Sequence, residues 1–364
     1  MKSQWTRLLG LVGSAALLTA CNPMTQKDPP FAGVMNRQDV KTSSIELKPM
    51  NPLAIVGAPV AWKTTSGKMP DGSRVIVGVV GTGIDYTIPD LRESLWINTG
   101  EMGDRFQNQN DDDGNGFADD LFGFDFFSGD GMPYDWYGHD TFTASIIAAT
   151  GRANKEVIGV APNASLMVAR YLGPDGRGNG FDAQMALNYV VNAGAKIVYF
   201  NWPQGGFPVD PNYGDPTPLV LDELRYAGKK NVLVVIPAGN SSNENLPKFI
   251  LEAAKIENVV VVAGVDKSGR LSKQSNYGKN LAAVAAPSED AVGYFPGGTV
   301  SNDLRTTSVA AAYATGAAAL IATQPGFGSA LKIKQALLSD VIPSRRGEEL
   351  NVLSEGVISV SAIK

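Results

Sequence analysis

Apolar and polar residues follow a repeating strand-and-helix pattern along most of the chain. Continuous or valine-rich apolar runs predict buried strands at 75–80, 166–171, 196–200, 231–236 and 258–264. Apolar residues at helical spacing, or dense in alanine, predict helices at 182–193, 218–229, 308–323 and 331–340. Strands that alternate with helices in this way predict a mostly parallel sheet covered by helices.

The composition fits a globular protein with a large core. The chain has 364 residues, of which 44% are hydrophobic and 18% are charged. Its net charge of −5 gives no basic footprint, so no nucleic-acid partner is expected. Cys21 is the only cysteine, which excludes a disulfide within one chain.

The first 21 residues have the features of an export signal. Lys2 and Arg7 precede a short apolar stretch, and Leu18-Thr19-Ala20-Cys21 resembles the lipobox of bacterial lipoproteins. This resemblance implies cleavage before Cys21, lipidation of its thiol and attachment to a bacterial envelope membrane, the outer one where the cell has one. The alternative is an ordinary secretory signal. Residues 22–52 are polar and contain several prolines, which predicts a tether.

Two residues suggest nucleophilic catalysis. His139 is the only histidine, and Ser308 stands near the start of a helix rich in small residues. A serine nucleophile needs a base to take its proton, and a histidine base needs an acid to hold its tautomer.

Six segments, in chain order, resemble the subtilases, the subtilisin-like serine proteases. They are 55–62, 77–91, 138–144, 158–164, 236–240 and 306–320. The resemblance implies a three-layer α/β/α sandwich over residues 53–364 and a serine-type endopeptidase fold. It also implies that Ser308 is the nucleophile, that His139 is the general base, and that Asn240 is the oxyanion donor.

The resemblance fails at the catalytic acid. Gly81 stands where the family's Asp-Thr-Gly motif has its aspartate, and glycine has no side chain to support His139. Asp85 lies past the following turn. Asp140 adjoins His139 on one helix, where successive side chains point about 100° apart. The sequence therefore predicts that no carboxylate reaches the imidazole.

The predicted substrate-binding edge also departs from the family. Asn201, Trp202 and Pro203 replace its Ser-Leu-Gly segment, which pairs with the substrate backbone. Pro203 has no N–H to donate, and Trp202 is bulky. Thr306 replaces a glycine that the family usually has two residues before the serine.

An acidic loop at 110–120 is a separate candidate site. Oxygen ligands at alternate positions suit Ca²⁺. The predicted ligands are Asp111, Asp113, Asn115, the carbonyl of Phe117, and Asp119. The alternative is a solvated acidic turn.

Three functions remain open from the sequence. The favoured one is a lipid-anchored pseudoprotease that binds a peptide or protein in its cleft without efficient hydrolysis, because Gly81 replaces the acid. The alternative is an active serine endopeptidase that uses Ser308 and His139 with a weakened or substituted triad. A weaker third is a hydrolase that acts on an ester.

Overall fold

The structure is a computed structural model that describes residues 37–45, 51–203, 205–212, 214–244, 246–344 and 349–363. The predicted signal peptide, Cys21 and most of the predicted tether lie outside the described residues. The chain divides into Met1–Arg37 and a compact unit, Gln38–Lys364, which carries all the elements below.

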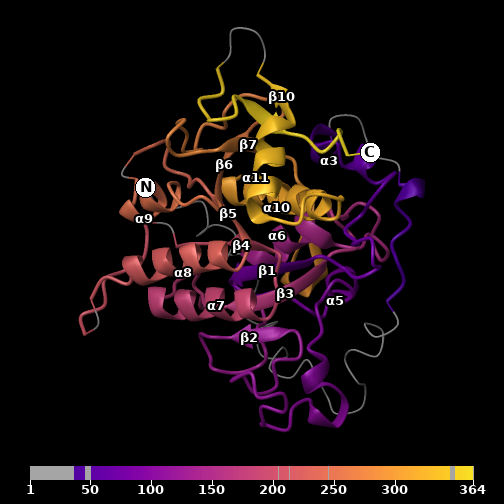
Figure 1. Cartoon of the computed structure of the whole chain (residues 1–364), viewed down its shortest axis with the longest axis vertical. Coiled ribbons are helices and arrows are strands. Elements are labelled where there is room, and N and C mark those ends of the chain that lie inside the picture. The colour runs from indigo at the N-terminus through magenta and orange to yellow at the C-terminus, as the bar shows by residue number, and fades with distance from the viewer. Residues whose placement is uncertain are drawn as a thin grey trace. The chain divides into compact units, whose positions relative to one another are not determined.

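A nine-stranded sheet forms the centre of this unit, in the order β10-β11-β7-β6-β5-β4-β1-β3-β2 (Figure 1). All neighbours pair in parallel except β10 and β11. The strands are β1 Ile76–Gly81, β2 Gly123–Asp125, β3 Ser165–Arg170, β4 Ile197–Phe200, β5 Leu233–Pro237, β6 Val259–Val265, β7 Val284–Pro287, β10 Val341–Pro343 and β11 Gly356–Ile358. A separate antiparallel pair is formed by β8 Gly293–Phe295 and β9 Thr299–Ser301.

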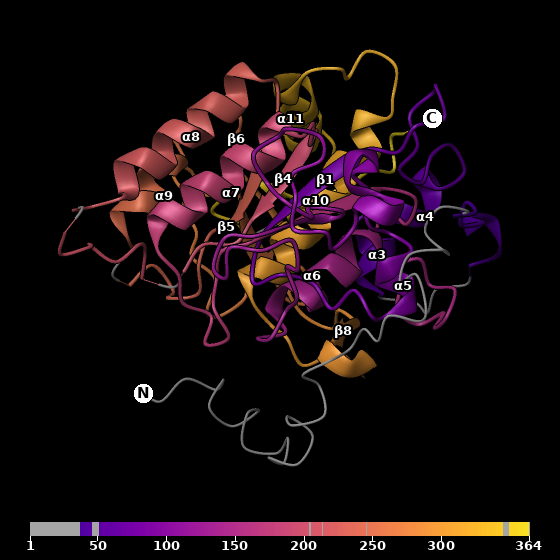
Figure 2. The ribbon, with the colours of Figure 1, turned by 90° about the horizontal axis from the view of Figure 1, so that it is seen from below.

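Helices cover both faces of the sheet. The longer ones are α6 His139–Ala148, α7 Gly180–Asn192, α8 Thr217–Lys229, α9 Lys248–Ala253, α10 Thr307–Ala322 and α11 Ala330–Ser339. Short turns of helix are α3 Pro52–Ile55, α4 Ala58–Ala61, α5 Pro89–Arg92, η1 Thr42–Ser44, η2 Thr99–Glu101, η3 Gly103–Arg105 and η4 Pro296–Gly298. In Figure 2, α7, α8 and α9 lie on one side of the strands, and α6 and α10 on the other. The three-layer sandwich predicted from the sequence is confirmed.

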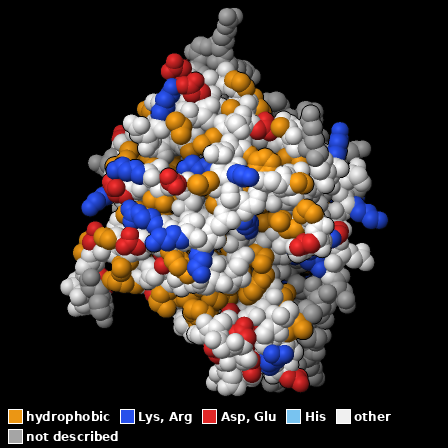
Figure 3. All heavy atoms as spheres, in the orientation of Figure 1, with side chains coloured by type: hydrophobic (Ala, Val, Ile, Leu, Met, Phe, Trp, Pro, Cys, Tyr) orange, Lys and Arg blue, Asp and Glu red, His pale blue; other side chains and the backbone are white. Residues whose placement is uncertain are grey.

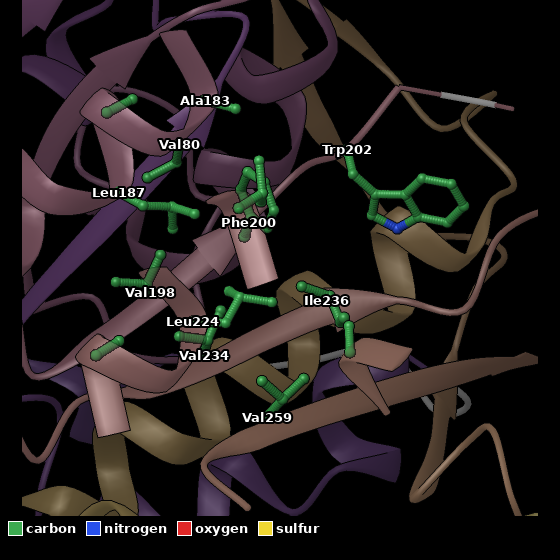
Figure 4. Close-up of a cluster of buried hydrophobic side chains, with 14 of the residues drawn as sticks. Val80, Ala183, Leu187, Val198, Phe200, Trp202, Leu224, Val234, Ile236 and Val259 are labelled. Atoms are coloured by element: carbon green, nitrogen blue, oxygen red, sulfur yellow. The ribbon is translucent and has the colours of Figure 1, made fainter. Parts of the chain in front are cut away.

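Side-chain alternation along the strands builds the core under α7 and α8. In β4, Val198 and Phe200 join the hydrophobic cluster that includes Leu187 of α7 and Leu224 of α8 (Figure 4). Burial of each such side chain contributes about 1.5–3 kcal/mol. Successive strand residues point to opposite faces, so Tyr199 points toward the layer of α6 and α10.

Helix α10 is buried along its whole length. All 16 residues are buried, and it contacts β4, β5, β6 and β7 as well as α6. Its run of alanines has no polar face, because no side of this helix meets water. Within the described part of the chain, no helix is both long and apolar enough to cross a bilayer.

The strand ends bring distant segments to one edge of the sheet. β1 ends at Gly81, β4 precedes Asn201, and β5 ends at Pro237, shortly before Asn240. These strands are parallel, so their carboxyl ends share an edge, the usual place for a ligand site in such sheets. Helices α6 and α10 begin beside this edge, and their first residues include His139 and Ser308.

We expect Gly316→Ala to destabilise the fold although alanine is the better helix former. A Cβ at Gly316 would stand 2.5 Å from Cβ of Val160, which is anchored close to its own backbone. Overpacking of this kind costs about 1–3 kcal/mol, against a gain of about 1 kcal/mol in helix propensity. Thermal unfolding of Gly316→Ala should show a lower melting temperature. Gly328→Ala, where a Cβ would meet nothing within 4 Å, should leave it unchanged.

Candidate active site

His139 and Ser308 each lie in the first turn of a helix. His139 opens α6 after Gly138, whose φ of 97° is a left-handed conformation that favours glycine. Ser308 is the second residue of α10. Only 7% of His139 and 5% of Ser308 is exposed, so both stand in a largely desolvated setting.

A carboxylate does reach the imidazole, and the prediction that none would is wrong. Oδ1 of Asp140 lies 2.5 Å from Nδ1 of His139, and the Asp140 side chain is fully buried. The helical divergence of neighbouring side chains does not prevent this contact. His139 is the first residue of α6, where no preceding helical turn restricts its side-chain rotamer.

The loop after β1 holds the Asp140 carboxylate in place. The backbone N–H of Thr82 donates to Oδ2 of Asp140 at 2.7 Å, and the N–H of Asp140 donates to Oγ1 of Thr82 at 3.0 Å. Nδ2 of Asn201 donates to Oδ1 of Asp140 at 3.2 Å. The side chain of Asn201, which was predicted to bind substrate, therefore supports the catalytic acid. Thr82 is a second partner of Asp140, which the sequence analysis missed.

Gly81 provides the space that this carboxylate fills. A Cβ at position 81 would lie 2.0 Å from Oδ2 of Asp140 and 3.0 Å from Cβ of Asn201. The edge of the sheet thus has room for one carboxylate, and here it comes from α6 instead of β1. Any residue larger than glycine at position 81 would displace it.

Asp85, the other proposed stand-in, serves a different purpose. Its Oδ1 accepts from the N–H and hydroxyl of Thr87, and its Oδ2 accepts from the N–H of Gly297 at 2.7 Å. Asp135 is also buried near α6, and it accepts from the N–H groups of Gly138 and Thr141. Burial, reinforced by the charge of Asp140, raises the pKa of Asp135 to about 6.

Asn240 is oriented as an oxyanion donor requires. Its Oδ1 accepts from the backbone N–H of Thr307 at 2.8 Å, which fixes which end of the amide faces the helix. Its Nδ2 has no hydrogen-bond partner among the residues that the structure describes. Because Thr307 directly precedes Ser308, this contact holds the amide beside the start of α10, where a developing oxyanion would form.

Trp202 is less of an obstacle than its size suggests. Only 7% of it is exposed, the ring packs against Phe249, and Nε1 donates to the carbonyl of Pro237 at 2.9 Å. Pro203 is half-buried and offers no N–H to a substrate strand. Of the two departures at this edge, only Pro203 removes a hydrogen bond that an extended peptide could use.

The acidic loop contributes Asp113 and Asp120 to a carboxylate cluster, which includes the predicted ligand Asp113 but neither Asp111 nor Asp119. Asp111 accepts from the N–H groups of Gly114, Asn115 and Gly116, and Asp119 accepts from those of Asn108 and Gln109. These carboxylates close turns. The candidate ligand atoms that lie within 4.8 Å of one another belong to Glu101, Asp113 and Asp120. In Figure 3, acidic side chains gather at the end of the molecule where this loop lies.

This cluster is partly buried and partly unsatisfied. Glu101 is wholly buried, and its Oε2 has no partner among the described residues. Burial raises the pKa of Asp120 to about 6, although Tyr189 donates to it at 2.7 Å. Asn115, a predicted ligand, lies beside the cluster and donates to Asp113 and Asp120, while its Oδ1 accepts from the N–H of Phe117. A buried carboxylate oxygen that accepts no hydrogen bond is a suitable ligand for a hard cation such as Ca²⁺.

Comparisons with known proteins give a consistent result. The profile of the subtilase family matches residues 72–354. The thermophilic serine proteinase of Bacillus sp. (strain AK1) is 30% identical over 76% of this chain and 58% of its own length. Thermitase of Thermoactinomyces vulgaris is 28% identical over 74% of this chain and 80% of its own length. A cold adapted subtilisin-like serine proteinase of known structure shares the fold, with a TM-score of 0.59 at 19% identity over 80% of this chain and 90% of that one.

We expect Asp140→Asn to remove the hydrogen bond that Nδ1–H of His139 donates to a carboxylate, because the amide of asparagine favours the other tautomer. A proton shared between an imidazole and a buried carboxylate exchanges slowly and gives a far-downfield proton resonance. His139 is the only histidine, so its assignment in an NMR spectrum is unambiguous. The resonance should be absent in Asp140→Asn and retained in Asp85→Asn. The opposite pattern would transfer the role to Asp85.

Proposed function

Because the chain belongs to the subtilase family, we propose that it is a working serine endopeptidase in which Asp140 replaces the family's aspartate. This is the active enzyme with a substituted triad that the sequence left as an alternative. The contact of 2.5 Å between Oδ1 of Asp140 and Nδ1 of His139 is the observation that carries the proposal. The same atom pair gives a serine-protease triad its correct tautomer.

The proposed reaction is acyl transfer through Ser308. His139 takes the proton of the Ser308 hydroxyl as Oγ attacks the scissile carbonyl, and Asp140 stabilises the resulting imidazolium. Nδ2 of Asn240 and the backbone N–H of Ser308 donate to the oxyanion. The leaving amine receives the proton from His139, and water then hydrolyses the acyl-enzyme.

The pseudoprotease hypothesis rested mainly on a histidine without an acid. Removal of the acid from such a triad costs about 10⁴-fold in turnover, or about 5.5 kcal/mol of transition-state stabilisation. Asp140 is buried and held by Thr82 and Asn201, so it can supply that stabilisation. Pro203 still removes one hydrogen bond from the substrate-binding edge. We expect this loss to weaken substrate binding.

The proposal includes a location at the bacterial envelope. The lipobox-like sequence that ends at Cys21 supports a lipid anchor, and several acyl chains together would hold it stably. Residues 22–52 would then separate the peptidase from the membrane, and a peptide or protein in the cleft would be the substrate.

A double variant that moves the aspartate from position 140 to position 81 should restore the arrangement of the family. Subtilases usually have glycine at the position of Asp140, so the two departures are reciprocal. We expect Asp140→Gly to lower kcat for a peptide substrate by about 10⁴-fold. Gly81→Asp alone should also lower kcat, because its Cβ would lie 2.0 Å from the Asp140 carboxylate. The double variant should recover much of the loss.

The values of kcat for wild type, Asp140→Gly, Gly81→Asp and the double variant form a double-mutant cycle. Its coupling energy measures how far an aspartate at position 81 compensates for the loss of Asp140. Ser308→Ala is the control for contaminating proteases. If wild type neither cleaves peptides nor reacts with a fluorophosphonate while Gly81→Asp does, the pseudoprotease hypothesis holds instead.

We also propose that the cluster of Glu101, Asp113 and Asp120 binds Ca²⁺. Carboxylate oxygens are its preferred ligands, and the unpartnered Oε2 of Glu101 supports the fit. A cation there would link η2 to the acidic loop and stabilise the fold without taking part in the reaction.

Removal of calcium by a chelator should lower the melting temperature. A ligand that is present at about 100 times its Kd contributes about 2.7 kcal/mol to the folded state, which corresponds to several degrees in a domain of this size. Glu101→Gln should abolish this response. Asp119→Asn should retain the response to the chelator, because Asp119 lies outside the cluster. If Asp119→Asn loses this response, the calcium ligands are those predicted from the sequence.

A further inference from the structure

Three buried side-chain atoms lack a hydrogen-bond partner among the described residues: Oε2 of Glu101, Oη of Tyr199 and Oγ1 of Thr306. Buried polar groups are rarely left in this state, because an unmade hydrogen bond destabilises the fold. Glu101 belongs to the carboxylate cluster. Thr306 precedes the serine by two residues, and Tyr199 faces the serine from the sheet. All three unpartnered atoms therefore lie at sites with a proposed function.

Tyr199 lies beneath the nucleophile. It is in β4, the central strand between β1 and β5, and it points away from the cluster that contains Val198 and Phe200. Its side chain is fully buried, and its nearest polar neighbours include the hydroxyls of Thr143 in α6 and Ser308 in α10. Neither hydroxyl meets Oη in hydrogen-bond geometry.

The phenol stays protonated at every working pH. Burial, reinforced by the charge of Asp140, raises the pKa of Tyr199 well above its usual value. Tyr199 is therefore a permanent O–H donor in a dry setting, and the serine hydroxyl is a possible acceptor beside it. Catalytic hydrogen bonds that are long in the free enzyme often tighten once substrate is bound.

We propose that Tyr199 is a positioning residue for Ser308. Its hydroxyl donates to Oγ of Ser308 when substrate fills the site, so that the proton of Ser308 can only point toward His139. The Oγ is then held with one lone pair toward the scissile carbonyl. This inference rests on the proposed peptidase function and adds a fifth side chain to Ser308, His139, Asp140 and Asn240.

A purely structural role does not explain the hydroxyl. Phenylalanine would fill the same space, as Phe200 does on the other face of β4, and would leave no unpartnered oxygen. Tyr294 gives the contrast, because its hydroxyl donates to Oδ2 of Asp90 at 2.6 Å. That hydroxyl has a structural partner, whereas the hydroxyl of Tyr199 does not.

The test compares Tyr199→Phe with Tyr294→Phe in the full chain. For Tyr199→Phe we expect kcat for a peptide substrate to fall about tenfold with KM unchanged, the rate of fluorophosphonate labelling of Ser308 to fall in parallel, and the melting temperature to stay the same or rise. For Tyr294→Phe we expect the reverse: a lower melting temperature with kcat unchanged.

Each outcome decides the matter. Unchanged kcat and labelling in Tyr199→Phe, or a fall in activity that only follows a lower melting temperature, would overturn the role of Tyr199 and leave the peptidase proposal intact. No cleavage and no labelling in wild type would overturn the peptidase proposal and this inference with it.

Discussion

The structure of the catalytic edge depends on one hydrogen bond, between the Asp140 carboxylate and Nδ1 of His139. The carboxylate occupies the volume in front of β1 that a side chain at position 81 would otherwise fill. The N–H of Thr82 donates to the carboxylate, the N–H of Asp140 donates to the Thr82 hydroxyl, and Asn201 joins the carboxylate to the segment after β4. A triad acid is defined by where its oxygen stands, and two different elements can deliver it there.

The sheet makes this exchange possible. β1, β4 and β5 end at one edge, and α6 and α10 begin there, so five segments that are distant in sequence converge at one place. The Asp140 carboxylate lies at the junction of β1 and α6. The packing around the junction is dense enough that only one carboxylate fits there.

The buried polar groups divide into two kinds. Most are fully paired, and they hold the fold: Asp90 accepts from Thr150 and Tyr294, and Asp85 fixes a turn and the loop at Gly297. The three side-chain atoms that lack a partner among the described residues belong to Glu101, Tyr199 and Thr306, at the proposed calcium site and beside Ser308. This distribution is expected if unsatisfied groups persist only where a ligand or a reaction gives them a partner.

The sequence by itself determined the layers, most helices and central strands, the identity of His139 and Ser308, and the absence of an acid at position 81. Apolar periodicity fixes these elements because strands buried on both faces and wholly buried helices have few alternatives. The short strands β8 to β11 escaped it, since three residues carry no period. Only the tertiary structure decided that Asp140 turns toward His139, that Asn201 supports the acid, and that Glu101 and Asp120 join Asp113. These contacts depend on rotamers and on loops that close over long separations. The reciprocal departures at Gly81 and Asp140 were the one sequence signal for the first of them, and only the distance between the two positions in space gives that signal its meaning.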